Sequence, residues 1–244
     1  MILGVIPARY ASSRFPAKPL VDIRGKSMIR RVYEQASQAS ELAEVIVATD
    51  DTRIFGHVQD FGGKVEMTAE HHRSGTERVA EVAARHPQYA YCVNIQGDEP
   101  FLDPAQIDLL CRTLRAPGVE IATLIRRLTD PAALLSPHTV KVVSDHRGDA
   151  LYFSRSPIPY FRDEADARHW PEHAAYYKHI GIYGFRREVL LAVAAMKPSP
   201  LEQAESLEQL RWLANGHRIR TAETNEEALA IDTPEDLDRL LNSL

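Results

Sequence analysis

The sequence has 244 residues, 44% hydrophobic and 26% charged, a composition typical of an ordinary globular protein. Its formal net charge of -5 and its pI near 6.1 argue against sequence-independent binding to nucleic acid, which needs an extended basic surface. Two cysteines are too few for a disulfide framework, and no apolar run approaches the ~20 residues of a membrane-spanning helix. Because the opening residues are also unlike a signal peptide, we expect a soluble, cytoplasmic protein.

Short apolar runs alternate with helical patterns over the first half of the chain, which is typical of βαβ units. The patterns predict strands at 2–7, 45–50, 64–68 and 91–96 and helices at 27–39 and 52–61. Two further helices are predicted to begin at Ser74, three residues before Glu77, and at Asp103, which precedes a proline. We therefore expect a doubly wound parallel sheet for roughly the first half.

The second half has a different pattern. The segments "VKVVSD" and "ALYFSR" flank "HRGD", which predicts a hairpin, and residues 156–175 are rich in proline, aromatic and charged residues, which predicts an irregular, mobile segment. A strand is predicted at 178–185, one helix over 201–216, and a last helix with Asp232 as N-cap. We expect one domain over 1–244 in which an insertion at about 130–200 supplies extra strands, a substrate lid and a dimer surface; whether 156–176 closes over the substrate is left open by the sequence.

Three cations follow the first predicted strand within one short loop: Arg9, Arg14 and Lys18. In parallel α/β sheets, ligands bind beyond the carboxyl ends of the strands, where this loop begins. A mixture of guanidinium forks and an ammonium point charge suits a polyphosphate better than a single carboxylate. The loop is therefore a candidate phosphate site, and the alternative is a solvated loop with incidental cations.

Carboxylates follow the fourth predicted strand in "NIQGDEP". Acidic groups facing a polyphosphate need a divalent cation between them, and Mg²⁺ takes one or two protein carboxylates plus phosphate oxygens. Asp98 is the first candidate ligand, with Gly97 allowing close backbone approach, whereas Glu99 is interpreted as a solvated turn residue. Asp232 becomes a second ligand only if the fold returns it to Asp98.

Two further sets of polar residues give weaker signals. "SGTER" offers Ser74, Arg78 and a helix N-terminus that favours anions, and a plain capped helix explains it equally well. The remaining polar residues suit an acidic, polyhydroxylated substrate, although each is individually more typical of a structural role: Arg155, His179, Tyr183, Glu208 and Gln209. The pair His71-His72 lacks zinc-ligand spacing and is discounted.

Taken in order, the segments "IPARYASSRFPAKPL", "ATDD", "SGTER", "NIQGDEP", "VKVV", "ALYFSR", "HIGIYGF", "LEQLR" and "DTPEDL" strongly resemble the 3-deoxy-manno-octulosonate cytidylyltransferase (CMP-KDO synthetase) family across nearly the full chain. The resemblance implies a Rossmann-like nucleotidyltransferase fold, with a mostly parallel central sheet flanked by helices. It also implies a cytoplasmic homodimer that uses Mg²⁺ and CTP to convert 3-deoxy-D-manno-octulosonate (KDO) to CMP-KDO and pyrophosphate, for lipopolysaccharide biosynthesis.

The resemblance also implies residue roles. Arg9, Arg14 and Lys18 would hold the triphosphate; Ser74, Arg78 and Gln96 would contact the nucleotide or its edge; Asp98 and Asp232 would hold Mg²⁺. The sugar pocket would be lined by Gln96, Arg155, His179, Tyr183, Glu208 and Gln209, and Arg9, Lys18, Asp98 and Asp232 would act in catalysis. The family usually carries glycine before the lysine, where this chain has Ala17.

Two other readings stay open. The first is a cytidylyltransferase for 8-amino-KDO or for a sialic acid, since one altered pocket contact separates the amino variant. The second is a non-catalytic nucleotide-binding protein on the same fold. Such a protein should have lost an essential cation or metal ligand, and this chain keeps Arg9, Lys18, Asp98 and Asp232.

Overall fold

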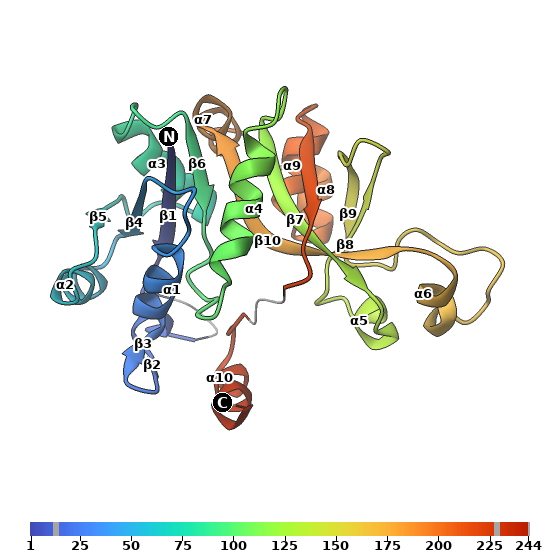
Figure 1. Cartoon of the computed structure of the whole chain (residues 1–244), viewed down its shortest axis with the longest axis horizontal. Coiled ribbons are helices and arrows are strands. Elements are labelled where there is room, and N and C mark those ends of the chain that lie inside the picture. The colour runs from blue at the N-terminus through green and yellow to red at the C-terminus, as the bar shows by residue number, and fades with distance from the viewer. Residues whose placement is uncertain (12–14, 227–229, 244) are drawn as a thin grey trace.

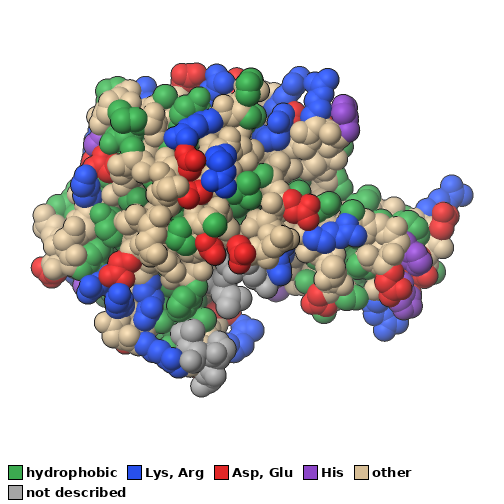
Figure 2. All heavy atoms as spheres, viewed as in Figure 1, with side chains coloured by type: hydrophobic (Ala, Val, Ile, Leu, Met, Phe, Trp, Pro, Cys, Tyr) green, Lys and Arg blue, Asp and Glu red, His purple; other side chains and the backbone are tan. Residues whose placement is uncertain are grey.

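A nine-stranded sheet forms the centre of the computed structural model, which describes residues 1–11, 15–226 and 230–243 (Figure 1). Its main path runs β11-β7-β10-β6-β1-β4-β5, and β8 and β9 extend it from β10. Within the described residues no helix is both long and apolar enough to cross a membrane. Basic and acidic side chains are interspersed over most of the face in Figure 2.

The first half is the predicted parallel sheet. Four strands lie parallel to their neighbours: β1 (Ile2–Ala8), β4 (Glu44–Thr49), β5 (Val65–Met67) and β6 (Tyr91–Asn94). After β1 the chain moves outward to β4 and β5, and then returns to place β6 on the other side of β1. The direction of winding therefore reverses between β1 and β6.

The described residues of this half form four α-helices, the last two of which begin at the predicted caps Ser74 and Asp103. They are α1 (Met28–Ala36), α2 (Thr52–Asp60), α3 (Gly75–Arg85) and α4 (Pro104–Leu114). Ser74 Oγ accepts a hydrogen bond from Glu77 N, and Asp103 caps α4. Helices α1, α2 and α4 bury their apolar faces in one core cluster, and α3 packs in the other.

The second half adds β7 (Ile121–Leu128), β10 (Tyr176–Arg186) and β11 (Ile219–Glu223). Strand β10 is antiparallel to both β6 and β7, while β11 is parallel to β7. The pairing of β10 with β7 shifts between Ile180 and Tyr183, so that two extra residues of β10 lie at this point. Such an irregularity redirects side chains and frees backbone groups from the ladder.

The predicted hairpin is formed by β8 (Lys141–Ser144) and β9 (Ala150–Ser154). Around it an arm projects at the right of Figure 1, made of α5 (Pro131–Leu135), η2 (Ala167–His169), α6 (Trp170–His173) and the start of β10. The arm has its own small core of Leu128, Leu134, Trp170 and Tyr176. Strand β10 continues from the arm into the central sheet, so the extra strands are present, whereas lid and dimer roles stay predictions.

The single helix predicted over 201–216 is wrong. The chain forms α8 (Pro200–Glu205) and α9 (Gln209–Ala214), separated by Ser206 with φ of 52°. Arg211 bridges the break to Glu202, with N–O distances of 2.7 and 2.6 Å. This ion pair holds the two short helices together, and helix α9 with α7 (Arg187–Ala194) joins the core face of α3.

The C-terminal segment returns to the N-terminal loop. Helix α10 (Pro234–Ser243) packs near η1 (Lys18–Leu20), β2 (Asp22–Ile23) and β3 (Lys26–Ser27). Ile231 and Leu240 are buried there with Ile23 and Met28. The prediction that Asp232 caps this helix is wrong, because Thr233 Oγ1 accepts from Asp236 N at 3.2 Å while Asp232 turns to Lys18.

Candidate active site

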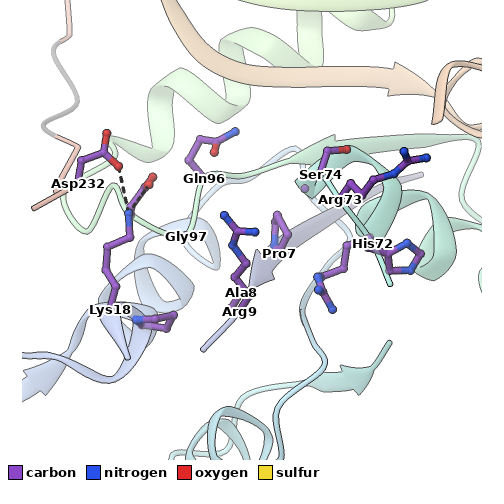
Figure 3. A pocket seen from close by; sticks show the side chains of 14 residues that line it. Pro7, Ala8, Arg9, Lys18, His72, Arg73, Ser74, Gln96, Gly97 and Asp232 are labelled. Carbon is purple, nitrogen blue, oxygen red and sulfur yellow. Dashed lines mark hydrogen bonds and ion pairs between the residues drawn. The ribbon is translucent and has the colours of Figure 1, made fainter. Parts of the chain in front are cut away.

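A cavity of about 350 Å³ opens at the carboxyl edge of the sheet, where the winding reverses between β1 and β6 (Figure 3). Its lining comes from the loop after β1, the start of α3, the loop after β6 and the C-terminal segment: Pro7, Ala8, Arg9, Lys18, Pro19, His72, Arg73, Ser74, Gly75, Arg78, Gln96, Gly97, Asp98 and Asp232. A Cβ atom on Gly97 would lie 3.0 Å from the carbonyl oxygen of Pro7. Glycine therefore favours the close approach of these two loops, because a Cβ atom here would need the backbone at Pro7 to shift by a few tenths of an ångström.

Three charged side chains meet at one side of this cavity, and we call them the Lys18 cluster: Lys18, Asp98 and Asp232. Lys18 Nζ donates to Asp98 Oδ2 at 2.8 Å and contacts Asp232 Oδ1 at 3.3 Å. It also donates to the carbonyl oxygen of Ile231 at 3.0 Å. The fold thus returns Asp232 to Asp98, which is the condition that the sequence left open.

Apolar packing places Asp232. Ile231 is 1% exposed in the core shared by α10, and its N–H donates to the carbonyl oxygen of Asp98 at 2.9 Å. The next residue is consequently held at the mouth of the cavity beside Lys18. The contact joins positions 18 and 232, which no local pattern could have connected.

The other predicted cations differ in their surroundings. Arg9 is exposed and lies between the Lys18 side and the His72 side of the cavity in Figure 3. Arg78 reaches the lining but is 4% exposed, and its guanidinium contacts Asp50 Oδ2 at 2.7 Å and Thr68 Oγ1 at 2.5 Å. Arg14 lies outside the described residues, so its predicted role is not placed.

Glu99 is not the solvated turn residue that the sequence suggested. Its side chain turns inward and is 7% exposed, and Oε2 has no hydrogen-bond partner among the described residues. Burial, with a smaller effect from the Asp98 carboxylate, raises the pKa of Glu99 to about 7. The two adjacent acids therefore differ: Asp98 faces the cavity and Glu99 the interior.

Sequence reasoning missed two cavity residues, His72 and Arg73. His72 was weighed only as a zinc ligand; its Nε2 contacts Glu81 Oε2, and its Nδ1 lies 3.9 Å from Glu77 Oε2. Their position in the sequence could have indicated that they line the cavity, because both residues directly precede Ser74, where α3 begins.

A second set of polar groups lies between α3, β10 and α9, and we call it the Glu208 cluster: Ser74, Thr76, His179, Tyr183 and Glu208. Ser74 Oγ donates to Glu208 Oε1 at 3.0 Å, and Thr76 Oγ1 donates to Oε2 at 2.8 Å. Burial raises the pKa of Glu208, while the two hydroxyl donors and Arg211 act in the opposite direction. Ser74 also lines the cavity, so it connects the two clusters.

Tyr183 and His179 come from the irregular part of β10. Their rings lie 5.2 Å apart, and the buried hydroxyl of Tyr183 has no hydrogen-bond partner among the described residues. Burial raises the pKa of Tyr183 well above its ordinary value, with Glu208 adding to the effect, and burial lowers the pKa of His179 to about 3. The cluster therefore holds a neutral phenol and a neutral imidazole.

Hydrogen bonds fix this part of β10. Thr123 Oγ1 lies 2.9 Å from His179 Nε2 and donates toward the carbonyl oxygens of Ile180 and Ile182, at 3.1 and 2.8 Å. Gln96 Nε2 donates to the carbonyl oxygen of Gly181 at 2.8 Å. Gln96 thus connects the cavity to β10, the strand that carries His179 and Tyr183.

Arg155 and Gln209 do not line the cavity, and neither do the sugar-site candidates His179, Tyr183 and Glu208. Gln209 is 5% exposed. The guanidinium of Arg155 is bound by backbone carbonyl oxygens, including that of Glu205 at 2.7 Å. Their substrate contacts stay predictions.

The Lys18 cluster gives the site a charged, open side, and the Glu208 cluster, which reaches the cavity only through Ser74, gives it a polar and more enclosed side. Cations with two carboxylates can bind a polyphosphate with a divalent ion. Hydroxyl, carboxyl and amide groups arranged at an enclosed site can bind a polyhydroxylated molecule with specificity. The geometry is thus suited to joining a nucleotide triphosphate to a polyol.

Comparison with known proteins agrees with this geometry. A family model described as cytidylyltransferase matches residues 3–219. Curated 3-deoxy-manno-octulosonate cytidylyltransferases from Cytophaga hutchinsonii and Geobacter metallireducens are 49% and 51% identical, covering 99% and 100% of this chain and 97% of each relative. The solved structure of CMP:2-keto-3-deoxy-manno-octonic acid synthetase complexed with CTP has a TM-score of 0.92 at 47% identity, covering 99% of this chain and 97% of that one.

Proposed function

Because the chain belongs to the 3-deoxy-manno-octulosonate cytidylyltransferase family, we infer that it transfers CMP from CTP to the anomeric hydroxyl of KDO, releasing pyrophosphate. The observation that carries this function is full-length identity of about half to relatives of that name. The Lys18 cluster supports this function, because it places one cation and two carboxylates at the sheet edge where α/β folds bind ligands.

The open side of the site would bind the triphosphate. Lys18 and Arg9 both line the cavity and would neutralise charge that builds on the leaving pyrophosphate. Helix α3 points its N-terminus at the same space through Ser74, and unpaired backbone N–H groups there favour an anion. Arg14, from the same loop, is assigned to the triphosphate by family resemblance.

The donor set at this side suits Mg²⁺. Asp98 and Asp232 both contact one cation, the Lys18 ammonium. Mg²⁺ is usually bound by one or two carboxylates together with phosphate oxygens and water. No group of three or more His, Cys, Asp or Glu residues able to hold a metal occurs in the described residues, so the nucleotide would supply the other ligands. When bound, Mg²⁺ would supply charge neutralisation and lower the pKa of a coordinated hydroxyl.

The enclosed side would bind the sugar acid. Glu208, Tyr183, His179 and Gln96 offer acceptors and donors for hydroxyl groups, and Arg155 offers a cation for the carboxylate. The unpartnered Tyr183 hydroxyl supports this role, because a buried polar group without a partner costs free energy that a ligand hydroxyl would recover.

The chemistry then depends on placement. The sugar hydroxyl attacks the α-phosphorus in line with the departing pyrophosphate, and transfers of this kind require mainly positioning and charge stabilisation from the protein. Ser74 and Gln96, which touch both sides of the site, would set the distance between the two substrates. We also propose a cytoplasmic homodimer acting in lipopolysaccharide biosynthesis, which light scattering and cell fractionation would test.

One assay tests the function. Pyrophosphate release is measured with CTP and Mg²⁺ against KDO, 8-amino-KDO and a sialic acid, with ATP, GTP and UTP replacing CTP as controls. We expect turnover with KDO and CTP only. A preference for 8-amino-KDO or for a sialic acid would change the assigned sugar substrate. If none of the three sugars led to pyrophosphate release, the chain would be a nucleotide-binding protein without this activity.

The metal role of Asp232 has a separate test. Asp232→Asn keeps the size of the side chain and removes its charge, so we expect a rate at least ~100-fold lower that rises with added Mg²⁺. Near-normal turnover at saturating Mg²⁺ would exclude Asp232 as a ligand.

A further inference from the structure

Lys141 is a fully buried lysine at the start of β8, and the function described above does not use it. Its exposed fraction is 0%. Nζ donates to three backbone carbonyl oxygens: Ser136 at 2.8 Å, Thr139 at 2.6 Å, and Arg155. Among the described residues, no carboxylate forms an ion pair with it within 4.0 Å, so these carbonyls are its partners.

The ammonium remains charged at neutral pH. Burial lowers the pKa of Lys141 to about 8, with Glu205 favouring the charged form and Arg155 opposing it. A protonated lysine has three N–H donors, which matches the three acceptors around it. Since a buried charge is costly unless its donors are satisfied, this arrangement is built around the lysine.

The three carbonyls belong to two segments. Ser136 and Thr139 lie in the loop from α5 to β8, at the base of the arm, whereas Arg155 follows the end of β9. A neutral side chain of similar length would leave the carbonyls without their donor. Lys141 therefore joins the arm to the hairpin.

Arg155 extends this joint toward the Glu208 cluster. Its backbone N–H donates to Glu205 Oε2 at 2.9 Å, and Nε donates to the carbonyl oxygen of Glu205 at 2.7 Å. Its two terminal nitrogens bond the carbonyl oxygens of Pro137 and Ser206, at 2.9 and 3.4 Å. Ser206 is the left-handed break between α8 and α9, two residues before Glu208.

We propose that Lys141 is a positioning residue for the sugar-acid side of the site, which it serves by holding Arg155 and, through Ser206, the turn that presents Glu208. This role rests on the proposed function. Lys141 does not line the cavity, so it acts through Arg155 rather than by touching substrate. Among the described residues these contacts end at Glu208, which approaches the cavity through Ser74 and has no direct contact with Lys18, Asp98 or Asp232, so the larger effect should fall on the sugar acid.

The test separates the two substrates. In Lys141→Met, we expect KM for KDO to rise about tenfold, equivalent to about 1.4 kcal/mol, while KM for CTP stays within about twofold. Arg220→Met is the matched control: Arg220 Nε contacts Asp149 Oδ1 at 2.7 Å at the other end of the same hairpin, away from Arg155. Both KM values should stay near wild type in this control.

Folding is checked by the shift in melting temperature that CTP produces, which should survive in Lys141→Met. If that variant does not fold, Lys141→Gln, which keeps two N–H donors, is measured in its place and should show a smaller rise in KM for KDO. Equal changes in both KM values, or no change in either, would overturn the positioning role. Inactivity of the wild-type protein toward KDO would instead overturn the proposed function.

Discussion

The two clusters of the site differ in how water reaches them. In the Lys18 cluster the side chains of Lys18, Asp98 and Asp232 are 14%, 26% and 43% exposed, and Lys18 forms ion pairs with both carboxylates. In the Glu208 cluster Thr76 and Tyr183 are 2% and 7% exposed, whereas Glu208 is 26% exposed and accepts hydrogen bonds from two hydroxyl donors. Water-accessible ion pairs are weak and exchangeable, whereas enclosed hydrogen bonds fix geometry.

The difference indicates that the two clusters have different functions. A triphosphate with its cation can displace the contacts among Lys18, Asp98 and Asp232, because these charges pair equally well with ligand charges. The Glu208 cluster has its hydroxyl donors in place before a ligand arrives, which suits discrimination among sugars. Changes in the first cluster should therefore reduce turnover most, and changes in the second should alter sugar preference.

The largest effect is expected from Lys18→Met. Without the ammonium, the two aspartates face the triphosphate with no positive charge from Lys18 between them. We therefore expect kcat/KM for CTP to fall about 1000-fold, which corresponds to about 4 kcal/mol of transition-state stabilisation. Lys26→Met is the control, since Lys26 pairs with Glu34 at 2.6 Å away from the cavity and should leave kcat/KM unchanged. A fall of less than about tenfold for Lys18→Met would show that Arg9 and Arg14 suffice for the triphosphate.

A smaller and more selective effect is expected from Glu208→Gln. The amide cannot accept both hydroxyl hydrogen bonds with the strength of a carboxylate, so kcat/KM for KDO should fall about 100-fold while KM for CTP changes less than about threefold. Glu188→Gln, an exposed change at the start of α7, serves as the control. If KM for CTP rose as much as KM for KDO, the two clusters would not be functionally separate.

Acid should destabilise the protein through His179. Its pKa is about 3 in the folded protein and near 6.5 unfolded, so between these values the unfolded chain binds the additional proton. The free energy of unfolding should fall as pH drops below 6.5, by no more than about 1.4 kcal/mol for each pH unit. Melting curves from pH 7 to 4.5 should show a steeper loss for wild type than for His179→Gln; parallel curves would assign the acid sensitivity to other groups.

The smallest effect concerns the loop that carries Lys18. Ala17 has a φ of 59°, in the left-handed region where an alanine is strained and a glycine is not. Ala17→Gly should raise the free energy of unfolding by about 0.5–1 kcal/mol, seen in urea titration. The same change at Ala195, whose φ is -83°, should lower it instead; a loss at both positions would mean that no strain is relieved at Ala17.

Much of the fold was predictable because its signals are local. Strands β1, β4 and β6 coincide with apolar runs, and α3 and α4 begin at the caps Ser74 and Asp103. The break at Ser206 was not predictable in this way. The apolar spacing continues through it, and the Arg211–Glu202 pair that holds α8 and α9 together forms only in the folded chain.

The sequence by itself determined which residues reach the cavity from the ends of two strands. Arg9 and Lys18 follow β1, and Gln96 and Asp98 follow β6. Parallel strands bring the loops at their carboxyl ends to one edge of the sheet. Tertiary structure alone decided that Asp232 joins them, that Glu99 turns inward, and that Lys141 lies at the centre of three carbonyls. The physical reason is the separation along the chain between the residues that interact. Caps and strand ends depend on neighbours along the chain, whereas a carboxylate's partner and burial depend on which apolar surfaces, such as that of Ile231, pack together after folding.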